Sequence, residues 1–298
     1  MLENIPLSII IPSRNPEYLQ RTIDDLLEKA EAPVEIIVVL DGYWPPKMIE
    51  DNSSVKVIHH GVQHYNSGMR SSINLGVQAS SGKYIMKIDE HCLVDQGYDV
   101  KLLADIEDNW VVIPRRYRMD TASYIPSLDR EPIDNMHLVF PYLGLAEWKW
   151  WRRTHNDILI DDCLGMQGSC YVMSRKHWDW LGGLNDKQFG TFDFEAQEIS
   201  FKTWLGGGRV VTNKKTWYAH AHRNRGFVRN FGFCNRQTEE IFGQKHVRTW
   251  EMGDYWLENE WEGRVHDFEW LIEKFWPIPT WPDNWKETAS SFNPFKTT

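Results

Sequence analysis

Residues 83–95, KYIMKIDEHCLVD, join a strand-like run to a cluster of polar side chains. The mostly apolar run Tyr84–Ile88 has the length of a buried strand, and it stops abruptly at Asp89, Glu90 and His91 before apolar residues return. Two acids and an imidazole at the end of a buried strand are costly unless a positive group lies beside them. The stretch therefore predicts a core strand whose carboxyl end belongs to a binding site.

The segments before this stretch alternate between strand and helix patterns. We expect strands at Leu7–Ile11, Glu35–Leu40 and Val55–Ile58, and helices over 19–27 and 69–77. The order strand, helix, strand, strand, helix, strand predicts an α/β fold with a largely parallel sheet. Ligands bind such sheets outside the carboxyl ends of the strands, and both Asp41 and Asp89 fall at such ends.

The later part of the chain has a different pattern. Residues 115–162 are irregular, and the sequence then predicts a helix from Arg175, a helix from about Asp193, and strands at Arg209–Val211 and Thr216–His220. From residue 227 onward tryptophans and acids dominate. We therefore expect one domain over 1–226 and a mainly helical, Trp-rich extension over 227–298 that packs on it.

The composition limits the possible functions. The hydrophobic share of 42% and the charged share of 25% are ordinary for a globular protein. The net charge of −9 argues against a generic binder of nucleic acid or acidic membranes, although not against a local basic groove. The four cysteines lack zinc-like spacing, which favours reduced structural thiols. No signal peptide or membrane span is visible, so we expect a cytoplasmic protein without a membrane anchor.

The polar cluster suits a metal ion. Positions 89 and 91 point the same way on an extended chain, and an oxygen and imidazole donor pair is compatible with Mn²⁺, whereas Mg²⁺ prefers oxygen alone. A solvated acidic turn explains these three residues equally well. A third ligand favours the metal, and WYAHAHRNR, residues 217–225, offers His220 or His222 at another strand end.

Several motifs resemble the polypeptide N-acetylgalactosaminyltransferases. GKYIMKIDEHCLVDQGY (82–98) is similar to their strand and metal motif, and FEAQEISFKTWLGGG (194–208) and YAHAHR (218–223) resemble two later segments. LSIIIPSRN (7–15) and EIIVVLDG (35–42) match the nucleotide-binding start that this family shares with glycosyltransferase family 2. The resemblance runs from about residue 7 to residue 225. It implies a GT-A fold, a catalytic domain over 1–226, and a UDP-sugar donor with Mn²⁺ or Mg²⁺.

The resemblance also implies roles for particular residues. The metal would be held by Asp89, His91 and His220. Asp41 would contact the uracil edge of the donor, and Arg223 would contact its diphosphate. The other residues that would bind the donor are Pro12, Arg14, Arg70, Asp89, Ser169 and Phe192. Phe192 replaces a tryptophan of the family and Ser169 a glycine, which leaves the identity of the sugar open.

The same motifs bear on the stereochemistry of transfer. The catalytic set would be Glu195, Arg223 and Asp193. Ala196 stands where inverting family 2 enzymes carry a catalytic aspartate, so we expect retention. The alternative is an inverting enzyme in which Asp193 or Glu195 acts as the base. We further expect the segment 223–232 to close over the bound donor, because it combines cations with glycine hinges.

The acceptor is less defined by the sequence. The stretch Trp148–Arg153, with Arg115, Arg116 and Arg118, predicts an acceptor side that mixes cations with aromatic rings. A glycan, a protein, or a hydroxylated base in nucleic acid would each be an acceptor of the right chemistry. A carbohydrate-binding protein without activity is the alternative outside the enzymes, although it would not need Asp41, Asp89 and His220 together.

Overall fold

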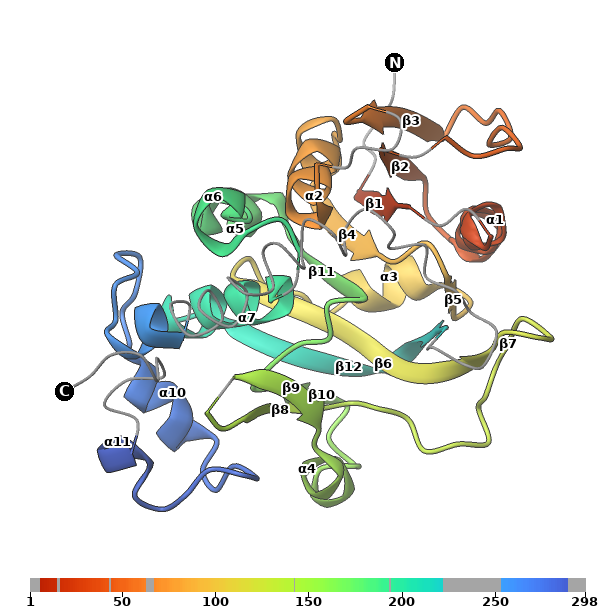
Figure 1. The fold of residues 1–298 in the computed structure, drawn as a ribbon. Coiled ribbons are helices and arrows are strands. Elements are labelled where there is room, and N and C mark those ends of the chain that lie inside the picture. The colour runs from red at the N-terminus through yellow and green to blue at the C-terminus, as the bar shows by residue number, and fades with distance from the viewer. Residues whose placement is uncertain are drawn as a thin grey trace.

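A ten-stranded mixed sheet forms the centre of the molecule in the computed structural model, which describes residues 6–14, 17–42, 44–62, 67–141, 143–192, 194–221 and 253–288. The main path runs β10-β12-β6-β11-β4-β1-β2-β3 (Figure 1). The strands are β1 Leu7–Ser13, β2 Val34–Asp41, β3 Val55–His60, β4 Tyr84–Ile88, β5 Cys92–Val94, β6 Trp110–Asp120, β7 Ile125–Pro126, β8 Met136–Val139, β9 Gly144–Glu147, β10 Ile160–Asp162, β11 Cys170–Ser174 and β12 Arg209–His220. The helices are α1 Leu19–Lys29, α2 Met69–Gln78, α3 Tyr98–Leu103, α4 Lys149–Thr154, α5 Arg175–Leu181, α6 Asp186–Phe189, α7 Glu195–Leu205, α10 Phe268–Lys274 and α11 Trp285–Thr288.

The predicted α/β order of the first hundred residues is confirmed. β1 pairs in parallel with both β2 and β4, and β2 pairs in parallel with β3. α1 and α2 cover opposite faces of this part of the sheet (Figure 1). Gly76 allows α2 to lie directly on β1, since a Cβ at this position would come within 2.4 Å of the Ile10 side chain.

The second half of the sheet is mixed in direction. β11 lies between β4 and β6 and is antiparallel to both, whereas β6 and β12 run parallel to each other. The strands β1, β2, β4, β6 and β12 therefore all point the same way, and their carboxyl ends meet at one edge of the sheet. The prediction of a mostly parallel sheet is confirmed, and this edge is where a ligand is expected.

Three local predictions need correction. The two strands expected over 209–220 are one strand, β12, whose register with β6 shifts between Asn213 and Trp217. The helix expected from about Asp193 begins at Glu195, after Phe194 in a left-handed conformation with φ 61°. Residues 115–162 are more regular than expected, because they contain the end of β6, the hairpin β8–β9 and α4.

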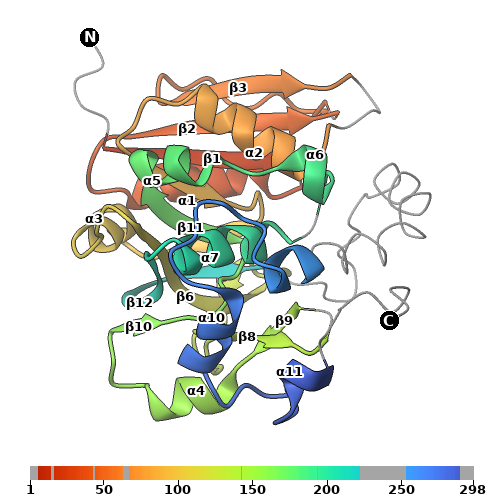
Figure 2. The same cartoon turned by 90° about the vertical axis from the view of Figure 1, so that its left-hand side faces the viewer.

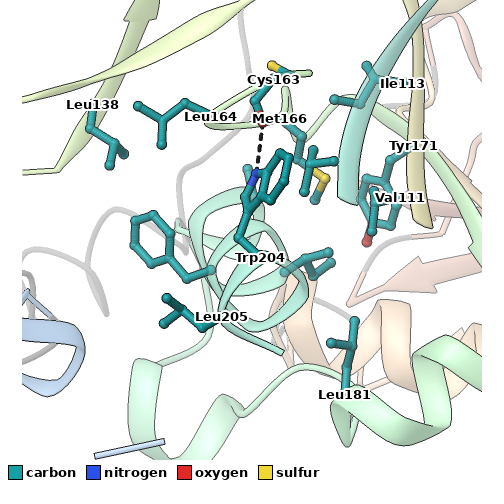
Figure 3. Close-up of a cluster of buried hydrophobic side chains, with 14 of the residues drawn as sticks. Val111, Ile113, Leu138, Cys163, Leu164, Met166, Tyr171, Leu181, Trp204 and Leu205 are labelled. Carbon is teal, nitrogen blue, oxygen red and sulfur yellow. Dashed lines mark hydrogen bonds between the residues drawn. The ribbon is translucent and has the colours of Figure 1, made fainter. Parts of the chain in front are cut away.

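The described C-terminal residues share a core with the sheet. Trp204 of α7 donates a hydrogen bond to the Cys163 carbonyl at 3.0 Å and lies among apolar side chains from several elements (Figure 3). Phe275, just after α10, packs edge-on against Trp204, and α10 lies beside α7 in both views (Figures 1 and 2). The division at residue 226 stays a prediction. Among the described residues, no helix is long and apolar enough to cross a bilayer.

Candidate metal and nucleotide site

Three predicted metal ligands come together at the carboxyl edge of the sheet. Asp89 and His91 lie in the turn between β4 and β5, and β5 pairs antiparallel with the end of β12, where Cys92 is opposite His220. One ligand atom from each of the three side chains lies within 4.8 Å of the others. Because the β5–β12 pairing brings two distant segments together, the fold itself assembles this cluster.

The two carboxylate oxygens of Asp89 have different surroundings. Oδ1 accepts from the buried Lys87 ammonium, which also donates to the Gly168 carbonyl at 2.6 Å. Oδ2 lies 3.1 Å from His220 Nε2 and 4.0 Å from His91 Nε2. The backbone amide of Asp89 donates to the Ser169 carbonyl at 2.9 Å, which fixes the turn. Oδ2 is therefore the oxygen that faces both imidazoles.

The protonation states of the cluster suit metal binding. Burial acts to raise the pKa of Asp89, but the Lys87 ammonium and the hydrogen bond from His220 outweigh it and hold the pKa far below its ordinary value. Burial lowers the pKa of His220 well below its usual range, more than the carboxylate of Asp89 raises it. An ionised carboxylate and a neutral imidazole are the forms that bind a metal ion.

The donor set therefore fits a divalent cation. Metal–ligand bonds of about 2.1 Å place ligand atoms about 3–4 Å apart, so the observed cluster needs only small shifts. A carboxylate oxygen with two imidazole nitrogens suits Mn²⁺ better than Mg²⁺. Of the two histidines offered by residues 217–225, His220 is the one in the cluster, and His222 lies outside the described residues.

Glu90 lies in the same turn as Asp89 and His91, and the sequence predicted no role for it. Its carboxylate accepts from the Ser13 hydroxyl and from the Arg14 amide at 3.0 Å, and its carbonyl accepts from Thr22 at 2.9 Å. These bonds tie the end of β1, with Pro12 and Arg14, to the metal-site turn. In an extended chain, successive side chains point to opposite faces, so residue 90 points away from residues 89 and 91. This alternation could have indicated that Glu90 contacts other groups than the metal ligands do.

Asp41 lies at the end of β2 and organises the turn before α2. Its Oδ1 accepts from the Ser67 amide at 2.6 Å and its Oδ2 from the Gly68 amide at 2.9 Å. Gly68 has φ 99°, and a Cβ there would meet Thr191 at 2.4 Å, so only glycine fits. Each carboxylate oxygen keeps a second lone pair. The expected contact with the uracil edge stays a prediction.

Arg70 is fully buried in a link between α2 and α7. Its guanidinium pairs with Glu198, whose other oxygen accepts from Lys202 at 2.7 Å and from the Asn185 amide at 2.9 Å. The guanidinium also lies over the Phe189 ring, 5.7 Å from its centre. The contact between Arg70 and a nucleotide stays a prediction, and the ion pair with Glu198 is the contact that the structure shows.

The remaining predicted site residues lie nearby or outside the described part. Glu195 begins α7 and is buried, Phe192 is half-buried, and the Ser169 hydroxyl lies 2.6 Å from the Tyr218 hydroxyl. Asp193, Arg223 and the segment 223–232 expected to close over the donor lie outside the described residues. Tyr218 lies in the YAHAHR motif without a predicted role, because its partner Ser169 is 49 residues away in the sequence.

Two of the arginines expected on the acceptor side are already paired with acids. Arg115 binds Asp134 through two bonds of 2.8 Å, and Arg152 pairs with Glu131 at 2.8 Å. Trp148 is buried, whereas Trp150 is 56% exposed. Because acids already compensate Arg115 and Arg152, these two residues add no net positive charge to a groove, and the described residues give no support to nucleic acid as the acceptor.

The amino-acid sequence of this chain is similar to a family model and to several known proteins. The family model described as Glycosyl transferase family 2 matches residues 8–180. A probable N-acetylgalactosaminyltransferase 7 of Caenorhabditis elegans is 24% identical over 276 residues, which is 85% of this chain and 45% of that protein. Polypeptide N-acetylgalactosaminyltransferase 8 of Drosophila melanogaster is 23% identical over 279 residues, with 86% and 45% covered. The chain thus spans less than half the length of these relatives.

The fold is also similar to that of a solved structure. GalNAc-T7 with UDP, GalNAc and Mn²⁺ superposes with a TM-score of 0.65 at 16% identity, over 92% of this chain and 57% of that one. At this identity the likeness concerns the fold. It agrees with the predicted GT-A architecture, which the strand order and the position of the metal cluster already indicated.

Proposed function

The chain belongs to glycosyl transferase family 2, and from this premise we propose that it transfers a sugar from a UDP-sugar to an acceptor hydroxyl with the aid of Mn²⁺ or Mg²⁺. The observation that carries the proposal is the cluster of Asp89, His91 and His220 at the carboxyl edge of the sheet. Ligands of such sheets bind at this edge. Proteins of similar sequence are named as N-acetylgalactosaminyltransferases, and the solved structure of similar fold contains UDP and Mn²⁺.

The proposed mechanism rests on leaving-group stabilisation. Departure of the sugar builds negative charge on the β-phosphate, and the bound cation would supply electrostatic stabilisation there. Arg223 is proposed to bind the diphosphate beside it, while Asp41, Pro12, Arg14, Arg70 and Phe192 are proposed to serve the nucleotide. Lys87 holds Asp89 in the orientation that directs Oδ2 toward the two histidines.

We propose that transfer retains the anomeric configuration. Ala196 has no carboxylate, so α7 offers no base at that position, and the leaving phosphate oxygen can take the proton of an acceptor on the same face. Glu195 is proposed to contact the sugar. An inverting route would instead use Asp193 or Glu195 as the base, and the NMR coupling at the anomeric proton of the product distinguishes the two. The proposed acceptor is a glycan or protein hydroxyl.

The metal assignment is tested by substitution of two ligands. Asp89→Asn and His220→Gln should each weaken Mn²⁺ binding at least tenfold, because each removes one of three ligand groups. Electron paramagnetic resonance of free Mn²⁺ measures this directly. UDP binding by calorimetry should depend on Mn²⁺ in the wild type.

The control is His266→Gln, a half-buried histidine stacked on Trp270 at 3.8 Å between ring centres, near α10. It should leave Mn²⁺ and UDP binding unchanged. Wild-type Mn²⁺ affinity in the folded Asp89 and His220 variants would contradict the proposed site, and tighter binding of GDP than UDP would contradict the donor class.

A further inference from the structure

Arg116 of β6 places a guanidinium beside the candidate site. Arg116 is paired in register with Tyr218 of β12, two residues before the metal ligand His220. Paired residues of neighbouring strands project to the same face of a sheet, so Arg116 shares the face of Tyr218, whose hydroxyl bonds Ser169. Two residues correspond to about 7 Å along a strand. The guanidinium thus belongs to the sheet surface just inside the metal cluster.

The Arg116 side chain is buried without an acid partner. The residue is 9% exposed, its Nε has no hydrogen-bond partner, and within the described part of the chain no ion pair reaches its guanidinium. The other two buried arginines there, Arg70 and Arg152, pair with Glu198 and Glu131. An uncompensated buried charge is costly, and groups of this kind are retained where they bind something.

The adjacent Arg115 provides an internal comparison. Asp134 binds Arg115 bidentately and, against the opposing effect of burial, raises the pKa of that guanidinium. Burial lowers the pKa of Arg116, and the more distant charge of Glu147, which acts to raise it, does not outweigh burial. Arginine nevertheless stays charged at neutral pH. One of two neighbouring arginines therefore has its counter-ion within the protein, and the other has no ion-pair partner among the described residues.

An unsatisfied acceptor lies next to Arg116. The Ile133 carbonyl accepts from the Arg116 amide at 3.2 Å and from Gln167 Nε2 at 3.0 Å, so the two residues are close neighbours. Gln167 Oε1 is buried and has no hydrogen-bond partner among the described residues. A ligand that satisfies both groups presents a carboxylate to Arg116 and a hydroxyl to Gln167. A sugar acid has both.

The order of the strands indicates which part of the donor would lie here. At the edge of the sheet where the carboxyl ends meet, Asp41 lies at the end of β2, and the turn with Asp89 and His91 lies at the end of β4. The next strands in the same direction across the sheet are β11 and β6. A donor with its base near Asp41 and its diphosphate at the metal would extend its sugar toward β11 and β6. The diphosphate itself would lie one to two strands away from Arg116, and strands are about 4.8 Å apart.

We propose that Arg116 is a specificity-determining residue that binds the carboxylate of a hexuronic acid, so that the donor is a UDP-hexuronic acid. This inference rests on the proposed function and deepens it. A planar guanidinium matches a carboxylate through two parallel hydrogen bonds, and a neutral hexose would leave the buried charge of Arg116 uncompensated. The charge on Arg116 thus favours an acidic sugar and disfavours a neutral one.

The test compares UDP, UDP-glucose and UDP-glucuronic acid, all with Mn²⁺, by calorimetry. The two sugars differ only at C6, which is a hydroxymethyl group in glucose and a carboxylate in glucuronic acid. The wild type should bind UDP-glucuronic acid at least tenfold more tightly than UDP-glucose. Arg116→Met should lose this preference and bind UDP within twofold of wild type, while the exposed control Arg264→Met should keep it.

A stability measurement separates a binding role from a structural one. Without ligand, Arg116→Met should melt at or above the wild-type temperature, because it removes an unpaired buried charge. Equal wild-type affinity for the two sugars would overturn the inference, as would a variant that melts several degrees lower or loses affinity for UDP itself. A wild type that binds no UDP with Mn²⁺ would instead overturn the proposed function.

Discussion

At the scale of single residues, His177 shows how burial controls charge in this protein. The imidazole lies in α5 and its Nε2 is 3.0 Å from the Thr203 hydroxyl, which lies in α7. Burial lowers the pKa of His177 from 6.5 to about 4. The folded protein therefore keeps this side chain neutral at pH values where the unfolded chain protonates it.

This difference makes stability depend on pH. Because the unfolded state binds the proton more readily, the contribution of His177 to the free energy of unfolding is complete above pH 6.5 and is lost as the pH falls from about 6.5 to about 4. Between pH 7 and pH 4.5 the wild type should lose roughly 2–3 kcal/mol relative to His177→Gln. Urea denaturation at both pH values measures this. An equal change in the free energy of unfolding of the wild type and of His177→Gln between the two pH values would show that His177 becomes protonated in the folded protein.

At the scale of elements, the contact between α2 and β1 depends on one missing side chain. Gly76→Ala should reduce the free energy of unfolding by about 1–3 kcal/mol, since its Cβ would overlap the Ile10 side chain and push the helix from the strand. This outweighs the higher helix propensity of alanine, which is worth about 1 kcal/mol. Urea denaturation gives the value. Gly144→Ala in β9 is the control without a steric clash, because nothing within the described part of the chain lies within 4 Å of its added Cβ, and an equal loss in both variants would refute the packing argument.

The sequence predicted strands and helices whose own residues show an apolar pattern. It did not predict elements whose burial depends on contacts with residues far away in the sequence. The strands β1, β2 and β4 are apolar runs of ordinary length, so their sequence suffices. The polar residues Asn213, Lys214 and Lys215 lie between the two strands predicted for this segment. Lys214 is buried there by an ion pair with Asp161 at 3.0 Å, and no pattern within β12 reveals that partner.

The same distinction applies to the candidate site. Asp89 was predicted from its place at the end of a strand, and His220 was preferred to His222 because of the family resemblance. The ion pair of Arg70 with Glu198 joins residues 128 positions apart, and the Asp41 bonds involve backbone amides that carry no sequence signal. Sequence reasoning thus predicted side chains that the structure brings together and missed the groups that hold them in place.

At the scale of the whole molecule, the C-terminal residues stabilise the sheet domain through α7. Phe275 contacts Trp204 of α7 and Trp151 of α4, with ring centres 5.3 Å and 5.5 Å apart. Trp281 donates to the Leu138 carbonyl of β8 at 2.8 Å. These contacts connect residues 253–288 to elements from three regions of the chain (Figure 2).

The shared core predicts cooperative unfolding. Phe275→Ala should lower the free energy of unfolding by about 3–5 kcal/mol, as expected for loss of a buried aromatic ring. Because Trp151 and Trp204 report on that region, tryptophan fluorescence and circular dichroism should change at one common urea concentration. Two separate transitions would mean that the C-terminal residues form an independent unit.

The salt bridge between Lys87 and Asp89 has a consequence for the order of assembly. The proposed ligand set contains one carboxylate, already balanced by an ammonium, and two imidazoles, so it offers an incoming dication no net negative charge. The phosphates of the donor supply that charge. Cation and nucleotide should therefore bind weakly alone and strengthen each other reciprocally. Titration of Mn²⁺ with and without UDP, and of UDP with and without Mn²⁺, should give the same coupling factor, and independent affinities would contradict it. An enzyme of this kind would be loaded by the metal–nucleotide complex and would release both after each turnover.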